Sequence, residues 1–276
     1  MPNITTRDGT SLFVKDWGAG RPVIFTHGWS LSADFWDYHA ALLSDAGYRV
    51  VTYDRRGFGR SDQPGSGYDY DSFADDLADV MAACGIDADT TLVGYSMGSG
   101  EVARYMSRHG GRGLVQAALI APVVPLLLKA DDNPHGYDPA KFDKQTRQLT
   151  DDRADFFRTY NKSLYGEGLI SHPVSAAVKD WTWTMQMQAG LRPLLAAREA
   201  FGRTDFRPDL SAFDVPTLIV DGTGDTDAPI DATARAAAAG IADARLIEYD
   251  GAPHGLVITH KDRLLSDLLN FLNEVA

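Results

Sequence analysis

Short apolar segments alternate with segments of helical periodicity along most of this chain. The apolar segments are residues 22–26, 48–53, 91–93, 114–120, 216–221 and 245–249, and the helical ones are residues 33–43, 70–83, 97–107, 231–239 and 260–274. Continuous apolar runs are typical of strands that helices cover on both faces. At residues 4–16, two shorter segments flank an Asp8-Gly9 pair, which predicts a hairpin at an antiparallel sheet edge. The whole pattern predicts an α/β fold with a doubly wound, mostly parallel sheet of about eight strands.

The alternation lapses between residues 122 and 210. Prolines there separate short helical pieces that are rich in aromatic side chains. We expect residues 122–210 to be a helical cap inserted into a single domain, 1–276, whose core comprises 1–121 and 211–276. Such a cap would cover the carboxyl ends of the strands, where open α/β sheets place their sites, and would exclude water from them.

The motif G-Y-S-M-G at residues 94–98 lies between a strand-like segment and a helical segment. A serine held there must sit in a tight, strained turn, and the flanking glycines let the backbones approach closely. The hydroxyl of Ser96 would then project at the carboxyl edge of the sheet, beside a helix amino terminus that favours an oxyanion. Gly and Ser are also ordinary turn residues, so the position between strand and helix is what marks Ser96 as a candidate nucleophile.

Ser96 needs a base to activate it, and that base needs a carboxylate to orient it. Asp225 lies in the loop after the first strand that follows the cap, and His254 lies in a Gly/Pro loop after the last strand. The chain order Ser, Asp, His is that of hydrolases built on such a sheet. We favour Asp225 as the acid because Asp221 lies inside a strand and Asp227 precedes an Ala-Pro step.

An oxyanion hole requires two N–H groups directed at one point. We expect one from Met97, directly after the nucleophile, and one from Trp29, in the loop that follows the segment 22–26. His27 in that loop is expected to bond to its own loop. The arginines of residues 54–62 could bind an anionic substrate, but we favour salt links that brace this segment.

The composition narrows the possible functions. A net charge of −12 disfavours nucleic acid and anionic membranes as partners. No apolar stretch approaches the length of a membrane helix, and residues 1–7 lack the apolar core of a signal peptide, so we expect a cytoplasmic protein. Cys84 is the single cysteine, which excludes an internal disulfide and suggests a small core residue. The Gly-Ser-Gly at 98–100 lacks the spacing of a nucleotide-binding motif.

Several motifs together carry a family resemblance: F-T-H-G-W at 25–29, Y-D-R-R-G-F-G-R-S-D at 53–62, G-Y-S-M-G at 94–98, T-D-F-R-P-D at 204–209 and A-P-H-G at 252–255. Nearly the whole chain resembles the cofactor-free bacterial haloperoxidase and aryl esterase family of α/β-hydrolases. The resemblance implies an esterase acting on small, often aryl, esters, without haem, metal or other cofactor. It also implies peracid formation from a carboxylic acid and hydrogen peroxide in some members, and a homo-oligomer, commonly a trimer or hexamer.

Two positions differ from the family pattern. Ser30 follows Trp29 where many peroxidase-like members have Pro, which weakens the expectation of peracid formation. Asp227 stands where an apolar pocket residue is common; if it faces the pocket, a more polar or cationic substrate is favoured, and otherwise it points to solvent. The residues expected to line the substrate pocket are Val123, Leu127, Tyr160, Phe201 and Asp227.

The resulting hypothesis is a serine esterase in which Ser96 attacks the acyl carbon, His254 transfers the proton and Asp225 orients the imidazole. Its partner would be a small-molecule ester. Opening of a lactone or γ-lactam by the same residues is an alternative. An alternative of another class is a small-molecule receptor of the same fold with little turnover.

Overall fold

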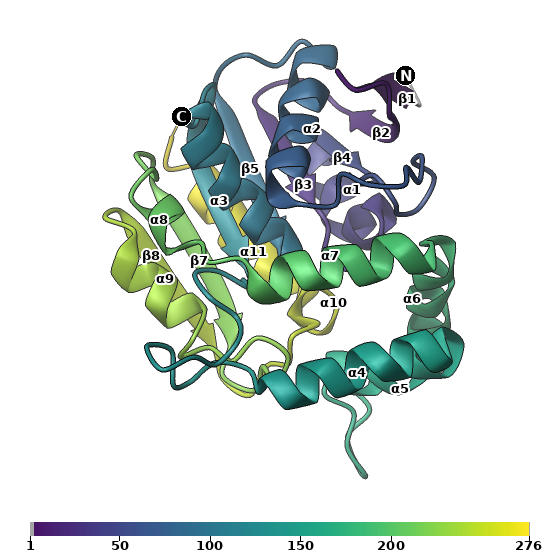
Figure 1. Ribbon diagram of the computed structural model, residues 1–276. Coiled ribbons are helices and arrows are strands. Elements are labelled where there is room, and N and C mark those ends of the chain that lie inside the picture. Colours follow the sequence, from purple (N-terminus) through teal and green to yellow (C-terminus); the bar gives the residue numbers. More distant parts are fainter. Residues whose placement is uncertain (1–2, 276) are drawn as a thin grey trace.

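The computed structural model describes residues 3–275, and the strands in this part of the chain form one sheet of eight strands in the order β1-β2-β4-β3-β5-β6-β7-β8 (Figure 1). Antiparallel pairing occurs between β1 and β2 and between β2 and β4, and all other neighbours are parallel. The prediction of a mostly parallel α/β sheet with an antiparallel edge is confirmed. The strands are β1 (Asn3–Thr5), β2 (Ser11–Trp17), β3 (Pro22–Thr26), β4 (Arg49–Tyr53), β5 (Thr90–Tyr95), β6 (Leu114–Ile120), β7 (Thr217–Gly222) and β8 (Ala244–Tyr249).

Helices cover both faces of the sheet. They are η1 (Ala33–Trp36), α1 (Asp37–Asp45), α2 (Tyr70–Ala83), α3 (Met97–His109), α4 (Pro139–Asp151), α5 (Arg153–Leu164), α6 (Ala176–Gln188), α7 (Leu191–Arg203), α8 (Arg207–Leu210), α9 (Ala234–Gly240), α10 (Leu256–Thr259) and α11 (Lys261–Leu272). In β3, Ile24 packs in the core cluster that contains Phe73 of α2, whereas Val23 packs in the cluster that contains Leu268 of α11. Because successive strand side chains point to opposite faces, both faces need apolar residues, which explains the continuous apolar runs.

Three helical segments begin or divide differently from the sequence expectation. The segment 33–43 starts as the 3₁₀ turn η1, whose first residues are capped by Ser32, before α1 begins at Asp37. The closing segment 260–274 is the helix α11, and a short additional helix, α10, precedes it from Leu256. The Ala-rich helix α9 starts only at Ala234, after a turn in which the Thr233 N–H bonds to the Pro229 carbonyl. Helical periodicity alone does not reveal these turns, because local hydrogen bonds decide them.

The helices α4 to α8 lie between β6 and β7 in the chain. Figure 1 shows α4, α5, α6 and α7 grouped at one end of the sheet, where β7 ends. This insertion therefore forms a layer of helices over the strand ends.

Candidate active site

Ser96 occupies the turn between β5 and α3. Its backbone has φ 52° and ψ −118°, a conformation that costs free energy for a residue with a side chain. A Cβ at Gly94 would lie 2.5 Å from the Gly98 carbonyl oxygen, and one at Gly98 would lie 2.7 Å from the Thr26 carbonyl oxygen. Only glycine at both positions allows the strand, the turn and the helix to pack this closely. The sequence thus holds Ser96 in a strained turn at the end of its strand.

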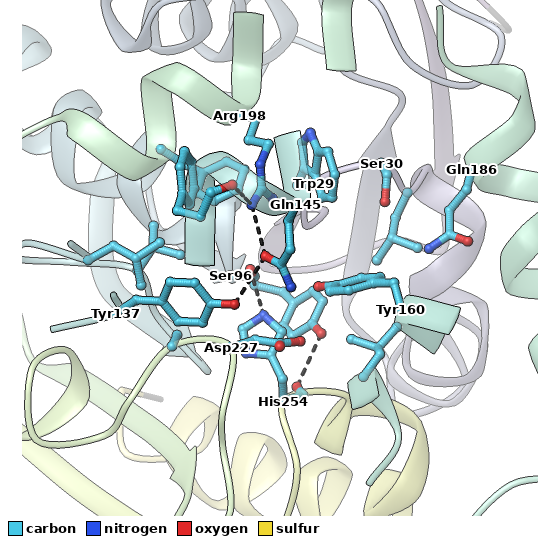
Figure 2. A pocket seen from close by; sticks show the side chains of 18 residues that line it. Trp29, Ser30, Ser96, Tyr137, Gln145, Tyr160, Gln186, Arg198, Asp227 and His254 are labelled. Carbon is cyan, nitrogen blue, oxygen red and sulfur yellow. Dashed lines mark hydrogen bonds between the residues drawn. The ribbon is translucent and has the colours of Figure 1, made fainter. Parts of the chain in front are cut away.

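His254 reaches Ser96 from the loop after β8. Its Nε2 lies 2.8 Å from Ser96 Oγ (Figure 2), and its Nδ1 lies 2.5 Å from Asp225 Oδ2. The imidazole is 5% exposed and the Asp225 side chain is fully buried. The structure therefore brings together the three residues that the sequence analysis selected from loops far apart in the chain, in the geometry of a hydroxyl, a base and an orienting carboxylate.

The loop after β7 holds Asp225 in place. Its Oδ1 accepts hydrogen bonds from the backbone N–H groups of Asp227 and Ala228, both at 2.8 Å, which leaves Oδ2 for His254. Burial alone would lower the pKa of His254, but the charge of Asp225 and the hydrogen bond to it raise that pKa above its ordinary value. The carboxylate therefore stabilises the imidazolium that forms when the base takes a proton.

Two further acids lie near Asp225. Asp221, at the end of β7, is fully buried, and burial together with the charge of Asp225 raises its pKa well above the ordinary value. Asp227 is half-buried and lines the pocket, and its Oδ2 has no hydrogen-bond partner among residues 3–275. Burial and the charge of Asp225 also raise the pKa of Asp227, against the opposing effect of His254. Neither acid contacts the imidazole as Asp225 does.

The two expected oxyanion donors lie beside Ser96. The backbone N–H groups of Trp29 and Met97 have no hydrogen-bond acceptor within residues 3–275. The indole of Trp29 donates to the Leu194 carbonyl at 3.0 Å, which anchors it to α7, and the Met97 carbonyl accepts from the Tyr70 hydroxyl at 3.0 Å. Both backbone N–H groups are therefore held in place, and each can still donate to an oxyanion.

His27 and the arginines after β4 are engaged within the protein. His27 Nε2 accepts from the Arg55 N–H at 3.0 Å, and Arg55 Nε donates to Glu101 at 2.8 Å. Arg56 Nε donates to Asp76 at 2.6 Å. These bonds confirm the expectation that this segment is braced by salt links.

A single pocket contains Ser96, His254 and all five residues expected to line it, namely Val123, Leu127, Tyr160, Phe201 and Asp227. The cavity beside Ser96 has a volume of about 40 Å³. The lining combines apolar side chains, such as Val123, Leu127 and Phe201, with polar ones.

The sequence analysis missed the polar side chains that the cap adds to this pocket, which are Tyr137, Gln145, Gln186 and Arg198. Tyr137 precedes α4 and Gln145 lies on it, Gln186 lies on α6 and Arg198 lies on α7. Figure 2 shows Gln145 and Arg198 on the side of the pocket opposite His254. No motif surrounds these positions, and a polar residue on an amphipathic helix is usually solvated, so no sequence signal could have identified them.

Comparison with known proteins places this site in a family. A family model described as the α/β hydrolase fold matches residues 21–261. The chain is 42% identical to a non-heme chloroperoxidase of Kitasatospora aureofaciens, over 99% of this chain and 100% of that protein. The chain belongs to the non-haem haloperoxidase family of α/β hydrolases. The resemblance inferred from the sequence motifs is confirmed.

Other members of this non-haem haloperoxidase family agree with the assignment. A bifunctional esterase/perhydrolase of Acinetobacter calcoaceticus is 38% identical, over 99% of both chains. The crystal structure of a bromoperoxidase from Bacillus anthracis superposes with a TM-score of 0.94 at 36% identity, and covers 98% of this chain and 99% of that one. The likeness therefore extends over the core and the cap alike.

Within residues 3–275, no group of three or more His, Cys, Asp or Glu side chains is arranged to hold a metal ion. None of the helices in this part of the chain is both long and apolar enough to cross a membrane.

Proposed function

We propose that this protein hydrolyses small carboxylic esters, aryl esters among them, through an acyl-enzyme formed on Ser96. The observation that carries the proposal is the chain of contacts from Ser96 Oγ through His254 to Asp225. The esterase/perhydrolase relative supports the same chemistry. A pocket around Ser96 supplies a place for the acyl group.

In the proposed reaction, Ser96 Oγ attacks the ester carbonyl carbon while His254 Nε2 takes the hydroxyl proton. The N–H groups of Trp29 and Met97 donate to the oxyanion of the tetrahedral intermediate. The intermediate collapses, and His254 returns its proton to the departing alcohol. Water, deprotonated by His254, then attacks the acyl-enzyme and releases the carboxylic acid. Asp225 holds the imidazole in the tautomer that these transfers need.

The same acyl-enzyme provides a perhydrolase activity when hydrogen peroxide replaces water as the attacking group. The product is then a peracid, which oxidises halide away from the enzyme, and the chloroperoxidase and perhydrolase relatives support this branch. Peroxide-dependent bromination of a dye in acetate buffer is expected from the wild-type protein and not from Ser96→Ala. Ester hydrolysis without bromination would limit the activity to the hydrolase.

The direct test is labelling by a fluorophosphonate together with nitrophenol release from 4-nitrophenyl acetate. Ser96→Ala should abolish labelling and lower turnover by about 10⁴-fold or more. Ser211→Ala, at an exposed serine outside the pocket, is the matched control and should behave as wild type. Full activity in Ser96→Ala would refute the proposal, and binding of small molecules without labelling or turnover would favour the receptor alternative. Lactones and γ-lactams belong in the same substrate panel, since their opening uses the same acyl-enzyme.

Self-association, which the family resemblance implies, and a cytoplasmic location, which the lack of a signal core at residues 1–7 favours, are part of the proposal. A trimer or hexamer would give a mass of three or six times 30.0 kDa in light scattering. A monomeric mass at micromolar concentration would contradict it.

A further inference from the structure

Arg198 is a buried cation in the pocket wall without a carboxylate partner. Three arginines are buried within residues 3–275. Arg55 pairs with Glu101 and Arg56 pairs with Asp76. Arg198, 4% exposed, forms no ion pair with any acid in this part of the chain. A buried charge without a counter-charge is costly, so this arrangement needs a reason.

The hydrogen bonds of Arg198 all go to neutral acceptors. Its Nε donates to Thr146 Oγ1 at 2.9 Å, and its Nη2 donates to the Phe142 carbonyl at 3.2 Å and to Gln145 Oε1 at 3.0 Å. The Phe142 ring stacks 4.0 Å from the guanidinium carbon. These contacts fix the position of the guanidinium, while Nη1 has no hydrogen-bond partner among the described residues.

The electrostatic surroundings of Arg198 also differ from those of the paired arginines. Burial opposes the charge of Arg55 as well, but the charges of Glu101 and Tyr53 raise its pKa above the ordinary value. For Arg198, burial prevails and lowers the pKa, against the opposing charge of Asp227, which lines the same pocket without contacting the guanidinium. An anion bound directly at the guanidinium would supply the contact counter-charge that Arg198 lacks.

Gln145 adds a second donor next to Arg198. Its Oε1 accepts from both Arg198 Nη2 and the Tyr137 hydroxyl, each at 3.0 Å. Because the guanidinium of Arg198 can only donate, it determines which end of the amide is oxygen, so Nε2 is the other end, and it has no partner among residues 3–275. Figure 2 shows this amide between Arg198 and Ser96. Two N–H donors thus remain available on the cap side of the pocket.

We propose that Arg198 and Gln145 form a carboxylate-binding subsite, so that the preferred substrate is an ester that carries a carboxylate on the part held by the cap. This inference rests on the proposed ester hydrolysis at Ser96. Charge-assisted hydrogen bonds from a guanidinium are stronger than neutral ones, and the planar donors match the carboxylate geometry. Asp227 lines the same pocket, which is the condition under which the sequence favours a more polar or cationic substrate, whereas the subsite proposed here favours a carboxylate at Arg198.

The experiment compares two pairs of esters that differ in one carboxylate. Mono-4-nitrophenyl adipate is compared with 4-nitrophenyl hexanoate, and 4-acetoxybenzoate is compared with 4-acetoxytoluene. The first pair places the charge on the acyl part and the second on the alcohol part. We expect kcat/KM of wild type to favour the carboxylate in one pair by about 10- to 100-fold. A ratio of one or below in both pairs would overturn the inference.

The ratio within each pair is then measured in variants, so that differences in folded fraction cancel. Arg198→Gln should bring the ratio close to one, and Arg198→Lys should keep part of it because the charge remains. Arg203→Gln is the matched control, since Arg203 lies on the same helix, is exposed and pairs with Glu199 and Asp143. An unchanged ratio in Arg198→Gln would contradict the subsite.

A binding measurement separates this inference from the proposed function. Calorimetry on Ser96→Ala should show that monomethyl adipate binds more tightly than dimethyl adipate, and that this difference is lost in Ser96→Ala/Arg198→Gln. Such binding without hydrolysis of any ester by wild type would support the subsite and refute the esterase. Hydrolysis of both esters, together with equal binding of the two adipates, would refute the subsite alone.

Discussion

The sheet side and the cap side of the pocket treat buried charge differently. On the sheet side, Arg55 and Glu101 are both fully buried and bonded to each other, and Asp225 faces His254. On the cap side, Arg198 is buried against neutral acceptors and aromatic rings. The sheet side pairs its buried arginine and the imidazole with carboxylates, although the Oδ2 atoms of Asp221 and Asp227 have no hydrogen-bond partner among residues 3–275. The cap side leaves a buried arginine without a carboxylate. The comparison suggests that the sheet side provides chemistry and stability while the cap side selects the substrate.

The largest expected effect is on the sheet side, at Asp225. Asp225→Asn should lower kcat by about 10⁴-fold, because the amide no longer stabilises the imidazolium or holds the correct tautomer. If the two sides divide the work as argued, the loss should be the same for esters with and without a carboxylate. Steady-state kinetics on both ester pairs measures it. A loss confined to the anionic esters would show that the sheet side also selects the substrate.

A second prediction concerns stability. Glu101→Gln leaves Arg55 buried without a counter-charge and should lower the free energy of unfolding by about 3–5 kcal/mol. Urea denaturation measures the change, and Glu199→Gln, which removes an exposed ion pair with Arg203, should cost about 1 kcal/mol or less. If Arg198→Gln destabilised the protein as much as Glu101→Gln, Arg198 would have a structural role like that of Arg55, and the proposed difference between the two sides of the pocket would be wrong.

The pH dependence of activity offers a third test. His254 must be neutral to accept the Ser96 proton, and Asp225 raises its pKa above the ordinary value of about 6.5. Activity should therefore fall about tenfold per pH unit on the acid side of a pKa that lies above 6.5. The pH profile of kcat/KM for a neutral ester measures this limb. A plateau that continued below pH 6 would mean that Asp225 does not hold the imidazole in its charged form.

The smallest expected effect is at Gln145. Gln145→Leu removes a neutral donor and should lower the preference for the anionic ester by less than about tenfold, since Arg198 remains. Measuring the two ester pairs in Gln145→Leu and in Arg198→Gln ranks the two donors. A larger effect from Gln145 than from Arg198 would show that shape or hydrogen bonding, rather than charge, selects the substrate.

Much of the fold and of the candidate site could be predicted because the signals are local. The apolar runs of β3, β5 and β7 reflect burial on both faces, and Gly94 and Gly98 reflect the tight turn around Ser96. Asp225 and His254 could be selected because parallel strands end at the same edge of a sheet, so their loops converge. The choice of Asp225 over its neighbours used the position of Asp221 inside the strand and of Asp227 before an Ala-Pro step.

The sequence by itself determined the layered sheet, the turn that holds Ser96 and the order of the acid and base, because strand periodicity and turn stereochemistry act over a few residues. Only the tertiary structure decided which side chains of α4 and α7 face Ser96. Their contacts join Thr146 to Arg198 and Tyr137 to Gln145 across separate elements of the cap. Whether a buried arginine has a counter-charge depends on such long-range packing, which no local pattern encodes.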